Sequence, residues 1–554
     1  MSTQRISPDW FKSAVVYQIY PRSYADSNGD GYGDVPGIIS KLDYLKTLGV
    51  DVIWLSPIYK SPQDDNGYDI SDYQDIDPMF GTLAEVQELF EQVHARGMKI
   101  VMDLVVNHSS DEHAWFLESA SSKDNPKHDW YIWRDAREGF EPGTPGAEPD
   151  DLIAYFTGSV WQYSPARKQY FFHQFSKKQP DLNWENPDVR AAVYKMMNWW
   201  IDLGVDGFRM DVINLISKDW SKAHLGTWSM CQNGPRIHEF LKEMNREVLA
   251  GKNLITVGEM PGATVEYARD YTDPARDELN MVFTFEHMDL DGTVGNSKFD
   301  YSKMQLVELK ANLNKWQKGL EQTGWNSLYW NNHDQPRIVS RWGNDGEHRV
   351  ASAKALGTVL HLMRGTPYIY QGEEIGMTNA YFTSLDQYQD IESLNWAKEA
   401  IEEGRSMERI LDSLRVKSRD NARTPMIWTA GENGGFTTGK PWLKVNENGK
   451  EINAEAAVND KNSVFWHYHD LISLRHSQPV VVDGTFDLIA PEHPQVFAYE
   501  RKLNGQVLTV VANFSDDVVE LPAGVADGST GELVIGEAVS GGKLAPWQSF
   551  AVLA

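Results

Sequence analysis

The chain has 554 residues, 41% of them hydrophobic and 12% aromatic, which is enough for one large catalytic domain with additions. Its net charge of −27, from 52 basic and 79 acidic residues, argues against nucleic acid or an anionic membrane surface as a partner. The single cysteine, Cys231, excludes an internal disulfide.

Neither a signal peptide nor a membrane span is indicated by the sequence. The N-terminal residues contain no long apolar run, and no stretch approaches the roughly 18 apolar residues that a membrane helix needs. The lack of disulfides fits a reducing compartment. We therefore expect a soluble cytoplasmic protein without nucleic-acid or membrane partners, either a monomer or a weak homo-oligomer.

Short apolar runs alternate with helical patterns over residues 1–108. Strands are predicted at Val15–Ile19, Val52–Leu55 and Lys99–Val106, and helices at Ile38–Leu48 and Leu83–Ala95. Such alternation is typical of parallel βαβ units. It stops between residues 109 and 178, a segment rich in aromatic residues, proline and glycine, which we interpret as an inserted B domain.

The alternation resumes after residue 178. Helices are predicted at Asp188–Leu203, Pro235–Leu249, Gln305–Gly319, Ala351–Met363 and Phe465–His476. Further strands are predicted near residues 209, 257, 283, 329 and 369, which brings the total to eight. Eight strands with intervening helices favour an α/β fold, a (β/α)8 TIM barrel made of residues 1–108 and 179–478. The stretch 379–461 is predicted to be irregular.

Residues 479–554 follow a strand pattern with glycine-rich turns. The predicted strands are Gln495–Glu500, Val507–Asn513, Val518–Leu521 and Phe550–Leu553. We expect a small C-terminal antiparallel β domain, too polar and too short to carry the chemistry.

Polar side chains gather at the predicted carboxyl ends of the barrel strands, where the active sites of such barrels lie. The segment Gly207–Asn214 carries Arg209 and Asp211, which face the same way because side chains i and i+2 share one face of a strand. A neighbouring arginine favours the ionised form of a carboxyl, as a nucleophile requires. The other strand-end residues are Asp103, His108, Glu259, His333 and Asp334.

Several carboxylates without a cysteine or histidine metal cluster indicate acid–base and nucleophilic chemistry on a neutral substrate. Glycoside hydrolysis fits best, because it uses one carboxylate as nucleophile and a second carboxyl as acid, about 5–5.5 Å apart in retaining enzymes. Adjacent strands carrying Asp211 and Glu259 can supply this pair. Neighbouring negative charge could hold Glu259 protonated.

Four segments resemble, in order, the signature regions of the α-amylase superfamily (glycoside hydrolase family 13). They are residues 103–108, 207–214, 258–260 and 331–334. The resemblance implies a nucleophile at Asp211, a general acid/base at Glu259 and a third carboxylate at Asp334. It also implies substrate ligands, namely Asp65, Tyr68, His108, Arg209, His333 and Arg419, with Arg423 as the alternative to Arg419.

Within this family the chain is most similar to oligo-1,6-glucosidases and dextran glucosidases. The segment Gln179–Asn183 resembles an extra signature of that branch, and Val212 resembles its α-1,6-specific members. The resemblance implies a retaining, exo-acting α-glucosidase on the α-1,6 bonds of isomalto-oligosaccharides. The alternatives are an α-1,4-glucosidase, a sucrose isomerase, a trehalose-6-phosphate hydrolase, a transglucosylase, or a carbohydrate-binding relative without catalysis.

The loop of residues 26–34 has oxygen-bearing groups at alternate positions, as at the start of a calcium loop. The predicted ligands are Asp26, Asn28, Asp30, the carbonyl of Tyr32, and Asp34. Closely spaced acidic side chains repel one another without a cation. We therefore expect a structural Ca²⁺ here, and no organic cofactor. The loop is not a complete EF-hand, because its twelfth position is Gly37.

Overall fold

The computed structural model describes residues 9–293, 297–539 and 541–554. The N-terminal residues 1–8, on which part of the signal-peptide expectation falls, lie outside these ranges. No helix in the described ranges is both long enough and apolar enough to cross a membrane.

One parallel sheet forms the centre of the molecule. In the described ranges its eight strands are β1 (Val16–Ile19), β2 (Val52–Leu55), β5 (Lys99–Leu104), β9 (Gly207–Met210), β10 (Ile255–Glu259), β11 (Met281–Phe283), β12 (Ser327–Leu328) and β13 (Thr366–Tyr370). Their order is β11-β10-β9-β5-β2-β1-β13-β12, and a parallel bridge from Val282 to Asn326 closes the ring. The predicted (β/α)8 barrel is confirmed.

The barrel strands are buried on both faces, as parallel sheets usually are. Every residue of β1, β2, β10 and β13 is buried. This explains why these strands were recognised from continuous apolar runs rather than from alternation.

Helices cover the outside of the barrel. Their bounds are α1 (Val35–Ile39), α2 (Leu42–Leu48), α3 (Leu83–Ala95), α5 (Pro187–Leu203), α7 (Ile237–Met244), α8 (Val265–Thr272), α9 (Leu306–Gly319), α10 (Ile338–Arg341), α11 (Arg349–His361) and α16 (Val464–Ser477). Helix α7 continues into one π-helical turn, Asn245–Leu249. The short helix α6 (Thr227–Cys231) lies in the loop after β9.

The helix ends follow from local side chains. Thr82 and Glu85 form a capping box at the start of α3, and Gly204, with φ of 118°, ends α5. The helix predicted at Ile38–Leu48 is instead two helices. Asp34 accepts a hydrogen bond from Gly37 N–H and so starts α1 early, and the chain breaks before α2.

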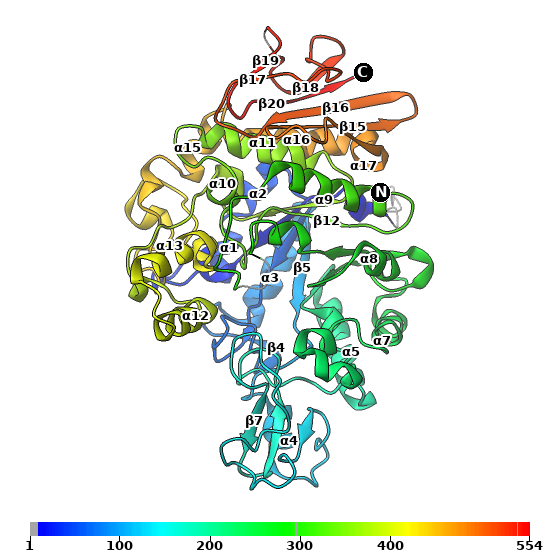
Figure 1. Cartoon of the computed structure of the whole chain (residues 1–554), viewed down its shortest axis with the longest axis vertical. Coiled ribbons are helices and arrows are strands. Elements are labelled where there is room, and N and C mark those ends of the chain that lie inside the picture. The colour runs from blue at the N-terminus through cyan, green and yellow to red at the C-terminus, as the bar shows by residue number, and fades with distance from the viewer. Residues whose placement is uncertain (1–8, 294–296, 540) are drawn as a thin grey trace.

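The segment between β5 and α5 carries α4 (Ala114–Ser121) and a three-stranded antiparallel sheet. Its strands are β6 (Trp133–Arg134), β7 (Trp161–Ser164) and β8 (Gln169–Phe172), in the order β6-β8-β7. Figure 1 shows this inserted segment at one end of the molecule and the C-terminal sheet at the other. A second, smaller excursion after β2 forms the hairpin of β3 (Tyr59–Lys60) and β4 (Asp72–Ile76). The residue limits of the inserted domain remain predictions.

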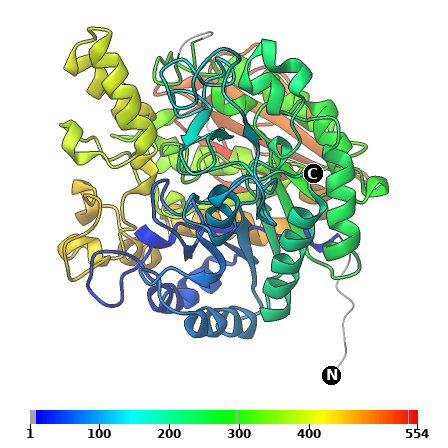
Figure 2. The same ribbon diagram turned by 90° about the horizontal axis from the view of Figure 1, so that it is seen from below.

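The prediction that residues 379–461 are irregular is wrong. This stretch contains α12 (Ile391–Glu402), α13 (Met407–Lys417), α14 (Asp420–Arg423) and α15 (Ala454–Asn459). Side-chain caps start three of them, since Asp390, Ser406 and Asn453 each accept a backbone N–H three residues ahead. Figure 2 shows α12 and α13, in yellow-green, projecting at one side of the barrel.

The C-terminal part begins with α17 (Pro479–Asp483) and is antiparallel β structure, as predicted, but its main sheet has five strands, two of which were not predicted. Its strands are β14 (Thr485–Ile489), β15 (Val496–Leu503), β16 (Gln506–Asn513), β18 (Glu532–Gly536) and β20 (Ser549–Leu553), and β17 (Val519–Glu520) pairs with β19 (Lys543–Leu544). One apolar core joins this sheet to α9, α11 and α16. The buried ammonium of Lys310, on α9, bonds to the carbonyl oxygens of Ala490, His493 and Val496.

We expect Gly207→Ala to destabilise the protein strongly. A Cβ at this position would lie 1.9 Å from the carbonyl oxygen of Ile255, because β9 and β10 are paired directly there. Overpacking of this kind costs about 3 kcal/mol or more. Urea unfolding measures the loss, and Gly346→Ala serves as control because its Cβ would meet only Asn344 Oδ1 at 3.5 Å. Equal stability of both variants would contradict this account.

Candidate active site

Arg209 joins three carboxyl groups at the mouth of the barrel. Its guanidinium lies 2.6 Å from Asp103 Oδ1, 2.6 Å from Asp211 Oδ1 and 2.6 Å from Glu259 Oε1. The register of the sheet brings them together, since Asp103 on β5 is aligned directly with Arg209 on β9, and Glu259 ends the next strand, β10. The arginine side chain is only 1% exposed, so its positive charge interacts almost entirely with these three carboxyl groups.

Asp103 is the most deeply buried of the three carboxyl groups. Its Oδ2 accepts hydrogen bonds from Trp54 Nε1 at 2.9 Å and Tyr68 Oη at 3.3 Å. Burial raises the pKa of Asp103 to about 6, although Arg209 works in the opposite direction. Asp103 is fully buried, and its oxygens are already in contact with Arg209, Trp54 and Tyr68. It therefore positions Arg209 and does not contact a ligand.

Asp211 and Glu259 differ in pKa in the order that a nucleophile and an acid require. Burial raises the pKa of Glu259 to about 8 against the opposing charge of Arg209, and the negative charges of Asp211 and Asp334 raise it further. Burial raises the pKa of Asp211 only to about 6. At neutral pH Glu259 therefore keeps its proton while Asp211 is mostly ionised. The sequence argument attributed the protonation of Glu259 to neighbouring charge, whereas burial is the larger cause.

The backbone at Val212 also holds Glu259. The N–H of Val212 donates to Glu259 Oε2 at 3.0 Å. Val212 has φ of 36° and ψ of 41°, a left-handed conformation that is rare and costly for a β-branched residue. The turn directly after Asp211 thus orients the second carboxyl.

Asp334 lies opposite Glu259 in a positive environment. Its Oδ1 is 2.7 Å from Arg423 and 3.3 Å from Arg419. Burial opposes ionisation, but His333, 3.2 Å away, and the guanidinium groups of Arg419 and Arg423 overcome it and hold the pKa of Asp334 well below its usual range. Arg419 and Arg423, which the sequence offered as alternatives, therefore both contact the same carboxylate.

His333 is neutral and fixed in orientation. Burial lowers its pKa to about 3. Its Nδ1 lies 2.8 Å from Gln18 Nε2 and its Nε2 lies 2.7 Å from Tyr68 Oη. With Gln18 as donor to Nδ1, the ring proton resides on Nε2, toward Tyr68 and Asp334.

Asp65 and His108 complete the predicted set. Asp65 lies 3.4 Å from Arg419 and accepts a hydrogen bond from Gln179 Nε2 at 3.2 Å. His108 Nε2 lies 3.1 Å from the carbonyl oxygen of Tyr68, and burial lowers its pKa to about 4. Gln179 thus ties the segment singled out at 179–183 to the pocket.

These side chains surround one cavity of about 250 Å³, which is small beside the roughly 300–1,000 Å³ of many ligand sites. Of the predicted site residues, seven line it: Asp65, Tyr68, His108, Asp211, Glu259, Asp334 and Arg419. Arg209 and His333 lie directly behind, where Arg209 contacts Asp211 and Glu259 and His333 contacts Tyr68 and Asp334. Val212 lies in the cavity wall.

The sequence reasoning missed Lys298 and Glu392 on the rim of the cavity and Asp390 behind it. Lys298 and Glu392 form an ion pair, and Asp390 lies 2.6 Å from Arg419. Glu392 and Asp390 belong to the start of α12, in the stretch that was predicted to be irregular. In the sequence, the start of that helix is indicated only by Asp390, a residue type that favours the N-cap position.

The predicted metal loop lies apart from this pocket. Asp26 accepts hydrogen bonds from the N–H groups of Asn28, Gly29 and Gly31, and Asp34 accepts from Ser27. Within residues 9–293, 297–539 and 541–554, no group of three acidic, histidine or cysteine side chains converges as a metal site. Oxygen donors of this kind suit a hard cation, and Ca²⁺ at this loop stays a prediction.

The comparisons with known proteins agree with this geometry. Residues 18–484 match the family described as "Alpha amylase, catalytic domain". The chain is 56% identical to an oligo-1,6-glucosidase of Halalkalibacterium halodurans, over 94% of this chain and 93% of that protein. It is 51% identical to a glucan 1,6-alpha-glucosidase of Streptococcus pneumoniae, over 98% and 99%. A trehalose-6-phosphate hydrolase of Bacillus licheniformis has a similar structure, with a TM-score of 0.93, 45% identity and coverage of 98% and 99%.

We expect Arg209→Met to cost about 3–5 kcal/mol of unfolding free energy at neutral pH, because three buried carboxyls lose their shared cation. Burial already raises the pKa of each carboxyl and Arg209 opposes it, so all three pKa values should rise further above their unfolded values. A carboxyl whose pKa is higher in the folded state than in the unfolded state stabilises the fold at pH values below its unfolded-state pKa. This stabilisation is lost as the pH rises through its folded-state pKa. Relative to the unsubstituted chain, the loss should therefore grow from about pH 6, the folded pKa of Asp103 and Asp211 in that chain, to above pH 8.

Urea unfolding at a series of pH values measures this dependence. Arg137→Met is the matched control, because in the described ranges Arg137 pairs with the exposed Asp151 of the inserted segment and otherwise donates to the Glu148 carbonyl. A loss of stability by Arg209→Met that is the same at pH 5 and pH 8 would contradict the shared-cation account.

Proposed function

This chain belongs to the α-amylase superfamily (glycoside hydrolase family 13), and we propose that it is a retaining exo-α-glucosidase that releases glucose from the non-reducing end of isomalto-oligosaccharides. The observation that carries the proposal is the pair Asp211 and Glu259. One guanidinium bonds both carboxyls, and their pKa values are separated in the order that the reaction needs.

The first step forms a covalent glucosyl–enzyme. Asp211 attacks the anomeric carbon of the terminal glucose, the bond to the glycosidic oxygen breaks, and Glu259 gives its proton to that oxygen. In the second step Glu259, now ionised, removes a proton from water, and the water oxygen displaces Asp211. Retention needs carboxyls about 5–5.5 Å apart, and the contact of both side chains with one guanidinium, at 2.6 Å each, accords with that spacing rather than the wider inverting gap.

The residues around this pair support binding of one terminal sugar. Asp334, ionised by Arg419 and Arg423, is placed to accept hydrogen bonds from ring hydroxyls, and Tyr68 can stack on the sugar face. Asp65 and Arg419, both buried, form an ion pair in the cavity wall, and Phe156 lies 5.4 Å from the guanidinium. A cavity of only about 250 Å³ suits an enzyme that binds the terminal sugar of a chain.

The linkage preference rests on the relatives and on the cavity rim. Relatives at 51–56% identity are named for α-1,6 bonds. Val212 narrows the wall where the second sugar leaves, with a side chain stiff at χ1. Lys298 and Glu392 reach the same rim and offer a donor and an acceptor to that sugar.

A trehalose-6-phosphate hydrolase is the second candidate, because one relative 51% identical has that name. A phosphate would need a cation at the rim. In the described ranges the lysine and arginine that line the cavity are Lys298, paired with Glu392, and Arg419, paired with Asp65 and Asp390. Both are already neutralised, which favours an uncharged substrate.

We also propose, from the sequence, a cytoplasmic location, a monomer or weak homo-oligomer, and a structural Ca²⁺ in the loop of residues 26–34. The ligands would be Asp26, Asn28, Asp30, the carbonyl of Tyr32, and Asp34. The loop is tied to the barrel by Asp34, which caps α1, and it contributes no residue to the cavity. The role of the ion would be to stabilise this loop.

We expect a bell-shaped pH dependence of kcat/KM. Activity should rise as Asp211 loses its proton, with an apparent pKa of about 6, and fall as Glu259 loses its proton, with an apparent pKa of about 8. Glu259→Gln should remove the alkaline limb and slow hydrolysis of isomaltose far more than that of p-nitrophenyl α-glucoside, whose leaving group needs no acid. An unchanged alkaline limb in Glu259→Gln would contradict the assignment.

A substrate panel tests the proposed reaction. Isomaltose should be cleaved in preference to maltose, sucrose and trehalose 6-phosphate, and p-nitrophenyl α-glucoside, whose only sugar product comes from the reacting glucose, should give α-glucose as the first product seen by NMR. Preferred cleavage of maltose or trehalose 6-phosphate would overturn the linkage, and initial β-glucose would overturn retention. Asp211→Asn should fold normally and lose at least about 10³-fold in kcat. Substantial turnover by this variant would remove Asp211 from the role of nucleophile.

Calcium binding is tested by thermal unfolding of the chelator-treated protein. Added CaCl₂ should raise Tm, since a ligand that binds only the folded state stabilises it. Asp30→Ala should abolish that rise and leave kcat unchanged, because Asp30 lies on the exposed side of the loop. A Tm that does not respond to CaCl₂ would contradict the proposal.

A further inference from the structure

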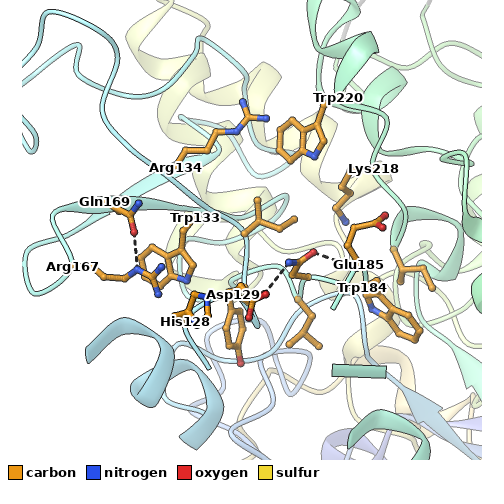
Figure 3. A pocket seen from close by; sticks show the side chains of 15 residues that line it. His128, Asp129, Trp133, Arg134, Arg167, Gln169, Trp184, Glu185, Lys218 and Trp220 are labelled. Carbon is orange, nitrogen blue, oxygen red and sulfur yellow. Dashed lines mark hydrogen bonds between the residues drawn. The ribbon is translucent and has the colours of Figure 1, made fainter. Parts of the chain in front are cut away.

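A second cavity, of about 490 Å³, lies between the inserted segment and the barrel. We propose that it is a binding site for an oligosaccharide, at which the sugar is held and not cleaved. In the described part of the chain it shares no lining residue with the catalytic cavity. Figure 3 shows Arg167 and Gln169 of the inserted segment on one side of it, with Lys218 and Glu185 of the barrel region on the other.

Two arginines of the inserted segment present partly unused donors to this cavity. The Arg134 guanidinium lies 3.9 Å from the ring centre of Trp220 and its nearest carboxylate oxygen, on Asp150, is 3.5 Å away. It makes no hydrogen bond within the described ranges. Packing on an indole fixes the plane of a guanidinium and leaves its N–H edge available.

Arg167 is held in the same manner. Its guanidinium lies 4.2 Å from the ring centre of Trp133. Its Nε and Nη1 donate to Gln169 and to the carbonyl of Ser119, and its Nη2 has no partner among the described residues. Burial lowers the pKa of Arg167 to about 10, as expected for a guanidinium short of acceptors.

Acceptors with a free oxygen lie in the same cavity. Asp129 receives one hydrogen bond, from Asn186 to Oδ1 at 2.8 Å, and Glu185 pairs with Arg236 through Oε2. The other oxygen of each carboxylate has no hydrogen bond within the residues that the structure describes. Figure 3 shows both carboxylates across the cavity from Arg134.

The balance of charge decides the class of ligand. Lys218 is paired with Asp181 at 2.8 Å, Arg134 with Asp150 at 3.5 Å and Glu185 with Arg236, so that arginines and carboxylates balance on the cavity wall. A simple anion would meet the carboxylates, a cation would meet the arginines, and an apolar ligand would leave all of them unpaired. A sugar carries hydroxyls that donate and accept at neighbouring positions, so it can satisfy both sets at once. The indole N–H of Trp220, unpaired within the described ranges, adds one more donor.

The wall of this cavity continues to the catalytic one. Lys218 Nζ donates to Asn107 Oδ1 at 2.8 Å, Asn107 Nδ2 lies 3.2 Å from His108 Nδ1, and His108 lines the catalytic cavity. A chain held in the second cavity is therefore anchored close to the site that consumes such chains. Binding in the second cavity would keep the substrate near the enzyme and would leave the chemical step unchanged.

Crystals and calorimetry of Asp211→Asn with isomaltotriose and with maltotriose test the proposal. We expect two molecules of isomaltotriose per chain, one in each cavity, and one of maltotriose, in the second cavity. In the same background Arg134→Ala, or Arg134→Gln where the first variant unfolds, should leave only the catalytic one. Arg137→Ala, in the same segment but outside the cavity lining, should keep both. On the active chain, Arg134→Ala should leave kcat for p-nitrophenyl α-glucoside within about twofold.

Three outcomes would overturn the proposal. They are a single site for both sugars, a second site that survives both Arg134 variants, or displacement of the sugar by inorganic phosphate at equal concentration. Failure of the α-1,6 proposal is distinguishable from these. In that case maltotriose would replace isomaltotriose in the catalytic cavity, while the binding that depends on Arg134 would remain.

Discussion

One buried cation organises the catalytic end of this barrel. Arg209 is bonded to Asp103, Asp211 and Glu259, on or directly after three adjacent strands. Three carboxyls in a water-poor site would repel one another and take up protons. A single guanidinium has five N–H groups in one plane, so it can serve all three without a second cation. The parallel register of β5, β9 and β10 is what makes this possible.

The carboxyl groups of this site have different pKa values because their environments differ. All three carboxyls lie 2.6 Å from Arg209, but burial, together with the charges of Asp211 and Asp334, lets Glu259 keep its proton to a higher pH. Asp334 is placed among other cations, Arg419 and Arg423, which come from α14 and the residue before it. One cavity can thus hold an acid, a nucleophile and a permanently ionised hydroxyl ligand at the same pH.

Much of this could be read from the sequence because the relevant residues lie beside one another along the chain. Arg209 and Asp211 are two residues apart on a strand, and their common direction follows from the period of a strand. The eight strands were recognisable as apolar runs. The helices α12 to α15 were missed because α14 and α15 have only four and six residues, and because the start signals of α12, α13 and α15 are single capping residues.

Other features could not be read in this way, because they depend on contacts between distant segments. The N–H of Val212 reaches Glu259 only because the chain turns left-handed at a valine, which local preferences argue against. Lys298 and Glu392 meet on the rim from segments 94 residues apart. The second cavity likewise needs both the inserted segment and the loop after β9. Such features are set by tertiary packing alone.

The buried lysine of α9 links the barrel to the C-terminal sheet, so the two cannot be treated as separate modules. Lys310 is completely buried, and its three hydrogen-bond acceptors are carbonyl oxygens of residues 490–496. A shorter chain that stopped at residue 478 would leave this ammonium without acceptors and expose the apolar faces of α9, α11 and α16. The C-terminal sheet is therefore part of the folding unit of the barrel. Exchange of this sheet between relatives would have to carry the α9 surface with it.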